Sequence, residues 1–185
     1  MALKPFCVAF DPKGRTWSKR DQKLPPYLYH VQHADSQATT YYLDSDCDSE
    51  SDASSSPEFP TIEASAPPLK TYFYRDLAAR AVIHQKWSSK VPSCFISAFD
   101  DFDHARNWAA QRLQRGRGPV HLYTIDTQKI QGKHIWVFCD PNEDEYFFLH
   151  RIPRDVIVDS QEVKLGKPPH RKCTYTHLGL ANRTP

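Results

Sequence analysis

The chain has 185 residues, of which 39% are hydrophobic and 12% aromatic, which suits one packed domain and is short for two. Its formal net charge is only +2. No apolar run approaches the roughly 18–20 residues that cross a bilayer, and the N-terminus does not resemble a signal peptide. We therefore expect an intracellular protein of the cytoplasm or nucleus, with no membrane partner.

The first part of the chain has few structural signals. Residues 1–26 are polar and interrupted by prolines, and we predict an irregular N-terminal segment. The run YLYHVQH at 27–33 is aromatic and β-branched and predicts the first core strand.

Residues 27–160 are predicted to form a single α+β domain, followed by a basic, mobile tail at 161–185. The five cysteines show no CxxC pairing, so reduced thiols are expected.

An acidic, serine-rich stretch interrupts this domain, and we predict that residues 44–68 form a flexible insertion. Residues 44–63 hold seven acidic and no basic side chains. The rest of the chain then carries 24 Lys and Arg against 15 Asp and Glu, an excess that favours phosphate-bearing ligands. Acidic residues follow Ser45 and Ser49, as in sites of acidophilic kinases. Phosphorylation of this insertion and a plain solvated loop both remain open.

Helical and strand patterns alternate after the insertion. The pattern predicts a strand at 69–75, a helix from Asp76 to about Trp87, a strand at 92–99, a helix at 100–114, and strands at 120–126, 134–139, 145–152 and 155–160. The later strands are joined by short connections, which are typical of antiparallel pairing. The sequence therefore predicts an α+β fold with a mainly antiparallel sheet and two or three helices.

The junction FISAFDDFDHARNWA at 95–109 combines a strand with the start of a helix. Asp100 or Asp101 can cap the helix, and Asp103 suits the positive end of its dipole. Capping explains these aspartates without a metal. Ser97 is a separate feature, because it shares one strand face with large apolar residues. It can bond a neighbouring strand or shape a pocket.

Other candidate motifs carry less information. Glu143 and Glu145 are two residues apart at the start of an apolar strand, so extended chain places them on one face. The stretch HRKCTYTH at 170–177 lacks the fourth ligand of a closed zinc site, and no metal is expected there. Rossmann, P-loop, serine-hydrolase and zincin signatures are absent from the sequence.

Three stretches occur in a recognisable order: YLYHV, FISAFDDFDHARNWA and EDEYFFLHRIPRDVIV. Together they resemble the ADP-ribosyltransferase fold of bacterial mono-ADP-ribosyltransferase toxins and their eukaryotic relatives. More closely, the chain resembles uncharacterised proteins of filamentous fungi with the pattern LYxV…FIS…A.NWA…YTIDT…FLHRIP. The resemblance covers about residues 27–160 without the acidic insertion, and it implies a split, mainly antiparallel sheet.

The resemblance implies a site for NAD as a substrate. His30 occupies the position of a phosphate-binding arginine, as in the histidine-bearing branch of the superfamily, where it contacts the nicotinamide-side ribose. Ser97 matches the first serine of a Ser-Thr-Ser motif, whose other two positions are not kept. Glu145 matches the catalytic glutamate that stabilises the oxocarbenium-like state, and Glu143 would orient the nucleophile. Tyr29, or Tyr123, would lie near the nicotinamide.

Two functions follow from these observations. The first is an NAD-consuming mono-ADP-ribosyltransferase or NAD glycohydrolase with an atypical His-Ser-Glu set, acting on an unknown protein or small-molecule acceptor. The second is a non-catalytic binding or regulatory protein on the same scaffold, because fold alone does not establish chemistry. Nucleic acid is not an expected partner, since the chain shows no ordered basic–aromatic stripe.

Overall fold

The computed structural model describes residues 6–11, 16–42, 58–66, 74–86, 89–130, 133, 135–140 and 145–164. Its helices are α1 (Tyr74–His84) and α2 (Phe102–Gln114), with 3-10 turns η1 (Thr127–Ile130) and η2 (Arg154–Val156). Its strands are β1 (Phe6–Asp11), β2 (Thr16–Lys23), β3 (Tyr27–His33), β4 (Ala38–Tyr41), β5 (Thr61–Ala64), β6 (Phe95–Phe99), β7 (Val120–Asp126), β8 (Val137–Asp140), β9 (Glu145–Leu149), β10 (Arg151–Ile152) and β11 (Ile157–Glu162).

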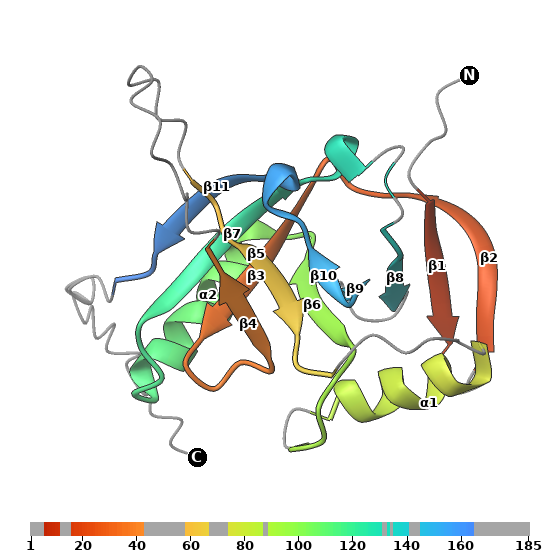
Figure 1. The fold of residues 1–185 in the computed structure, drawn as a ribbon, viewed down its shortest axis with the longest axis horizontal. Helices are drawn as coiled ribbons and strands as arrows, with labels where there is room; N and C mark the ends of the chain where they lie inside the picture. The colour runs from red at the N-terminus through yellow and green to blue at the C-terminus, as the bar shows by residue number, and fades with distance from the viewer. Residues whose placement is uncertain are drawn as a thin grey trace, which may run out of the picture.

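Eight strands form the main sheet in the order β11-β7-β3-β6-β9-β8-β1-β2, and β10-β5-β4 form a second sheet (Figure 1). Every pair is antiparallel except β1 with β8. The predicted α+β class with mainly antiparallel pairing is thus confirmed, with two α-helices in the described part of the chain. Neither helix is long and apolar enough to cross a membrane.

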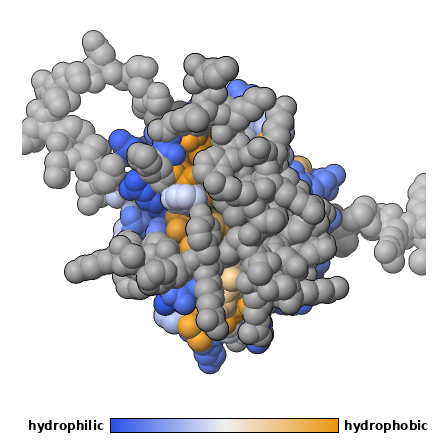
Figure 2. All heavy atoms as spheres, turned by 90° about the vertical axis from the view of Figure 1, so that its right-hand side faces the viewer, coloured by the Kyte–Doolittle hydropathy of each residue, from blue (hydrophilic) through white to orange (hydrophobic). Residues whose placement is uncertain are grey.

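The two faces of the main sheet are covered by different elements. On one face, α1 packs on Phe95 and Phe147, and α2 packs on Val31 and Leu122. On the other face, alternate residues of the same strands, such as Ile96 and Phe148, pack against the small sheet. The small sheet contributes Ala38, Ile62 and Ile152 to this layer. Figure 2 views the molecule from the side of β1 and β2, where hydrophobic residues are seen between hydrophilic ones.

The predicted irregular segment at 1–26 is wrong, because β1 and β2 form an antiparallel hairpin there. The hairpin joins the main sheet through parallel pairing of β1 with β8. These hydrogen bonds come from a strand more than 100 residues away, so the local sequence pattern could not reveal them. The domain therefore begins before residue 27.

The predicted flexible insertion at 44–68 is also partly wrong. Its later part contains β5, which pairs with both β4 and β10. Ile62 in this strand is fully buried, so its burial offsets the entropy cost of ordering the segment. The first part, with Ser45 and Ser49, lies outside the described residues.

Other boundaries shift by smaller amounts. Helix α1 begins at Tyr74, where a strand was expected, and ends at His84 rather than near Trp87, which lies outside the described residues. The strand expected at 145–152 is interrupted at His150, whose φ of 68° lies in the left-handed region and ends the extended run. The first two residues of the tail expected from 161 are the end of strand β11, and residues 165–185 lie outside the described part.

Helix α2 follows the sequence closely. Asp101 is its N-cap, and the carboxylate accepts a hydrogen bond from the backbone N–H of His104 at 2.6 Å. Asp103 lies in the first turn. After the last helical residue, Gly116 adopts a φ of 73°, a conformation that glycine tolerates without strain. The predicted capping role of the aspartates is confirmed for Asp101.

Candidate functional site

Strands β3 and β6 are neighbours in the main sheet but share a single residue pair, Tyr29 with Phe99. By contrast, β3 pairs with β7 along its whole length from Tyr27 to His33. A cavity of about 380 Å³ is lined by residues of both β3 and β6. The cleft is thus placed where pairing between two adjacent strands is nearly lost.

The cleft is lined by residues from seven parts of the chain. They come from β3, from the turn that follows it with the first residue of β4, from the segment after β5, from the end of α1, from the segment before β6, from β6 itself, and from α2 with the loop after it. The chemistry-bearing members are His30, His33, Asp35, His84, Lys86, Lys90, Ser97, Trp108, Arg112 and Arg117. These segments are far apart in sequence, so the site exists only in the folded chain.

His30 bridges the two diverging strands. Its Nδ1 lies 2.7 Å from the carbonyl oxygen of Ser97, and its Nε2 lies 3.0 Å from Oε1 of Gln32. Gln32 in turn donates through Nε2 to the carbonyl oxygen of Ala38 at 2.6 Å, which fixes its amide orientation. His30 therefore links β3, β6 and the first residue of β4.

The His30 ring faces an oxygen atom at each nitrogen. A neutral imidazole carries one N–H, so only the charged ring could donate to both Ser97 and Gln32. Burial nevertheless holds the pKa of His30 below its usual value, against the effect of these two hydrogen bonds. His30 is thus neutral at pH 7, with one of its two contacts lacking a hydrogen.

Ser97 makes a second contact with a histidine. Its Oγ lies 2.8 Å from Nε2 of His84, the last residue of α1. The His84 ring packs against Phe95 and, edge to face, against Phe147, with centroids 5.9 and 5.4 Å away. Burial, and secondly the neighbouring His30, lower the pKa of His84 to about 4. His84 is therefore an uncharged partner of Ser97 at neutral pH.

Basic and aromatic groups form the other end of the cleft. The guanidinium of Arg112 lies 3.9 Å from the ring centroid of Trp108, a cation–π contact. His33 packs on the same indole, with ring centroids 5.7 Å apart. Burial lowers the pKa of His33 to about 4, helped by the positive charges of Arg112 and Arg117. This end of the cleft thus holds its positive charge on arginines rather than on histidine.

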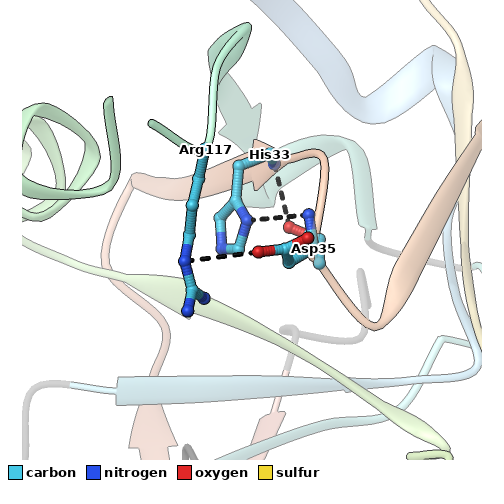
Figure 3. Close-up of polar contacts among 4 residues, drawn as sticks. His33, Asp35 and Arg117 are labelled. Carbon is cyan, nitrogen blue, oxygen red and sulfur yellow. Dashed lines mark hydrogen bonds and ion pairs between the residues drawn. The ribbon is translucent and has the colours of Figure 1, made fainter. Parts of the chain in front are cut away.

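The turn after β3 is tied to the loop after α2. Nε of Arg117 lies 3.3 Å from Oδ2 of Asp35 (Figure 3). The backbone N–H of Asp35 donates to Nδ1 of His33, and the backbone N–H of His33 donates to Oγ of Ser36. These contacts hold Arg117 over His33 (Figure 3). Asp35 is the one carboxylate among the described residues that line the cleft.

Glu145 lies in the sheet beside the cleft. It is the first residue of β9, is 4% exposed, and pairs with Phe99 of β6. It therefore shares a sheet face with Ser97, which pairs with Phe147 two positions along. Glu145 is not among the residues that line the cleft.

The remaining predicted site residues lie outside the cleft lining or outside the described part of the chain. Tyr29 is half-buried, packs edge to face on Phe102 with centroids 5.3 Å apart, and does not line the cleft. Burial raises the pKa of its hydroxyl. Tyr123 is buried and stacks on His30, with centroids 6.4 Å apart. Glu143 lies outside the described residues. The structure thus brings together His30 and Ser97.

Sequence reasoning missed His84, Arg112 and Arg117 as site residues. The sequence pattern placed His84 and Arg112 within the two predicted helices and assigned neither of them a role. No local motif marks any of them, because each reaches the cleft through the packing of its helix or loop. In the described part of the chain, no group of three His, Cys, Asp or Glu residues is placed to hold a metal. The residues 170–177 lie outside that part.

The chain belongs to a protein family described as Domain of unknown function (DUF7587), whose model matches residues 23–142. The match spans every residue that lines the cleft, from His30 to Arg117. No curated protein and no solved structure matches the chain.

Proposed function

We propose that the protein is a binding module for an anionic nucleotide, with NAD or another ADP-ribose-bearing molecule as its ligand. The observation that carries this proposal is the composition of the cleft. Among the described residues, four cationic side chains and one carboxylate line a cavity of about 380 Å³. The cations are Lys86, Lys90, Arg112 and Arg117.

Charge is the first support. The described cleft lining holds four cationic side chains against one carboxylate, Asp35, which faces Arg117. A concave site with this surplus attracts anions, and arginine suits phosphate because its planar group donates two parallel hydrogen bonds. Phosphate groups of a nucleotide would therefore lie at the end formed by Arg112 and Arg117.

The aromatic and polar walls are the second support. Trp108 presents an indole to a planar ring, and His33 and Phe99 flank it. At the opposite end, the neutral histidines and Ser97 offer hydrogen bonds suited to uncharged hydroxyl or amide groups. Cavities of this size and mixed lining are typical of small-molecule sites.

We choose NAD as the ligand because the chain resembles ADP-ribosyltransferases. In that fold, a site opens beside a strand that carries Arg or His and a strand that carries serine. His30 and Ser97 lie on two such strands here, and their contact of 2.7 Å crosses the point where pairing is lost. This arrangement supports an ADP-ribosyltransferase-like scaffold.

Binding is favoured over glycosyl transfer because of Glu145. Transfer of ADP-ribose needs a carboxylate close to the ribose, where it stabilises the developing positive charge. The Glu145 carboxylate is almost fully covered, and the one carboxylate of the described cleft lining, Asp35, lies at the arginine end. The proposed function is therefore ligand binding.

Isothermal titration calorimetry with ADP-ribose and NAD tests this proposal. We expect Arg112→Gln or Arg117→Gln to weaken binding about 10- to 100-fold, as loss of a charged hydrogen bond does. Arg106→Gln is the matched control, because Arg106 is exposed on the same helix and does not line the cleft. Absence of binding, or equal loss in the control, would contradict the proposal.

An NAD-consuming transferase or glycohydrolase is the second candidate, favoured by the shared sheet face of Ser97 and Glu145. It requires the Glu145 side chain to reach the ligand when NAD is bound. Nicotinamide release from NAD, with and without a protein or small-molecule acceptor, measures this activity. We expect Glu145→Gln to abolish release and to retain ADP-ribose binding if the chemistry is present. Binding of NAD without release of nicotinamide would support a non-catalytic binding module and not a transferase or glycohydrolase.

A further inference from the structure

We propose that Ser97 and His84 form a nucleophile–base pair that hydrolyses a carboxylic ester carrying a negative charge. The pair lies in the cleft described above, and only the preference for an anionic ester rests on the proposed function. Both side chains line the cavity. No part of the resemblance to ADP-ribosyltransferases assigns a role to His84.

The geometry of the pair suits nucleophilic catalysis. Ser97 Oγ and His84 Nε2 are 2.8 Å apart, within the reach expected for a nucleophile and its base. With the proton of the neutral ring on Nδ1, Nε2 accepts the hydrogen bond from the serine hydroxyl. The hydroxyl is thus aligned to give its proton to His84.

The surroundings fix both partners. His84 is held by the rings of Phe95 and Phe147, which leaves Nε2 directed at Ser97. His30 contacts the carbonyl oxygen of Ser97 and so positions the serine main chain on β6. His30 acts here as a positioning residue.

The end of α1 favours the charge that forms on His84 during reaction. His84 is the last residue of that helix, where the backbone dipole stabilises a cation. In the resting state, burial keeps the ring neutral and able to accept a proton. The base is therefore unprotonated at pH 7 and able to accept the serine proton, and the helix dipole offsets part of the cost that burial places on its charged form.

The reaction balances without a cofactor. Ser97 Oγ attacks the ester carbonyl carbon while its proton passes to His84 Nε2, which gives a tetrahedral oxyanion. The carbon–oxygen bond to the alcohol then breaks, and the alcohol leaves with the proton from His84. Water attacks the acyl-serine with His84 again accepting a proton, and this releases the acid and restores Ser97. The cations of the cleft stabilise the oxyanion electrostatically.

The pH profile separates this chemistry from background hydrolysis. The charged and titratable groups of the cleft near this end are His30 from β3, Lys86 after α1 and Lys90 before β6. Asp76 and Arg80 of α1 and Cys94 before β6 line a second cavity together with His84. Since the pKa of His84 lies at about 4, the base is fully deprotonated above about pH 6. The rate should be flat from there to pH 8, whereas attack by free hydroxide rises about tenfold per pH unit.

The test uses diisopropyl fluorophosphate with intact-mass analysis, and hydrolysis of 4-nitrophenyl hemisuccinate and 4-nitrophenyl acetate. We expect the full-length protein to gain one diisopropylphosphoryl group on Ser97 and to prefer the anionic hemisuccinate. Ser97→Ala should lose labelling, and His84→Gln should lower the rate at least about 100-fold. The His84→Gln side chain can still hydrogen-bond Ser97, so a loss there reports the base rather than folding.

Ser89→Ala is the matched control. Ser89 also lines the cleft, and its Oγ accepts a hydrogen bond from the backbone N–H of Val91 rather than facing a histidine. It should be labelled as fast as the wild type. The proposed pair would be overturned if Ser97→Ala is still labelled, or if His84→Gln hydrolyses the esters at the wild-type rate. It would also be overturned if the rate of ester hydrolysis rises with hydroxide concentration. Equal hydrolysis of both esters would overturn the anionic preference. Binding of ADP-ribose without labelling would remove the pair and leave the proposed function standing.

Discussion

Three histidines line the candidate cleft: His30, His33 and His84. The resemblance to ADP-ribosyltransferases predicted His30 and Ser97 as site residues, and the structure places them in contact. His84 could not be predicted, because its partner lies 13 residues away across the helix-to-strand connection and no local pattern marks the pair. Glu145 was predicted as the catalytic residue from the same resemblance, and its neighbours cover it in the sheet.

The lowered histidine pKa values make stability depend on pH. His33 and His84 have a folded-state pKa of about 4, below the value of 6.5 expected in the unfolded chain. The unfolded chain therefore binds more protons in this window, and stability falls as pH falls from about 6.5 towards 4. Each group contributes at most about 1.4 kcal/mol per pH unit.

Urea unfolding between pH 7.5 and 4.5 measures this dependence. We expect the free energy of unfolding to drop through this range, and His84→Gln to flatten part of the slope because it removes one buried titrating ring. An identical slope in the variant would show that His84 does not carry the effect.

At the scale of single elements, helix α2 was predictable and the edge hairpin was not. The α2 boundaries follow from Asp101 at one end and Gly116 at the other, both local signals. Strands β1 and β2 depend on pairing with β8, which no local pattern reveals. Strand β5 was not predicted, because it has only four residues and comes after a long acidic, serine-rich stretch.

Removal of the α2 cap should destabilise the protein modestly. Asp101→Ala leaves the backbone N–H of His104 without its acceptor, and we expect a loss of about 1 kcal/mol. Asp103→Ala is the comparison, because it removes only a favourable charge in the first turn and should cost less than about 1 kcal/mol. Chemical denaturation of both variants gives the two values. A larger loss for Asp103→Ala would contradict the assignment of Asp101 as the cap.

A core role for β5 can be tested in the same way. Ile62 is fully buried in the layer between the two sheets, so Ile62→Ala should cost about 2–5 kcal/mol. Glu63 is the exposed neighbour, and Glu63→Ala should change stability by less than about 0.5 kcal/mol. Thermal unfolding of both variants would distinguish a core strand from a flexible insertion. Equal, small effects would show that β5 does not belong to the core.

For the whole molecule, topology explains why the cleft lies where it does. One face of the main sheet carries both helices, and the pairing of β3 with β6 is reduced to one residue pair between them. The helix ends then bring His84 and Arg112 to the same opening. The sequence predicted the fold class, but the charge of the cleft depends on this assembly.

A backbone-amide NMR titration with ADP-ribose locates the ligand on the folded chain. For a nucleotide site in the cleft, we expect saturable shift changes in β3, in β6 around Ser97, and at the end of α2 near Arg112, with β11 and the β1–β2 hairpin unaffected. Added salt should weaken the response, because the ligand is held largely by charge. Saturable shifts confined to another part of the molecule, or none at millimolar ADP-ribose, would contradict a nucleotide site in the cleft.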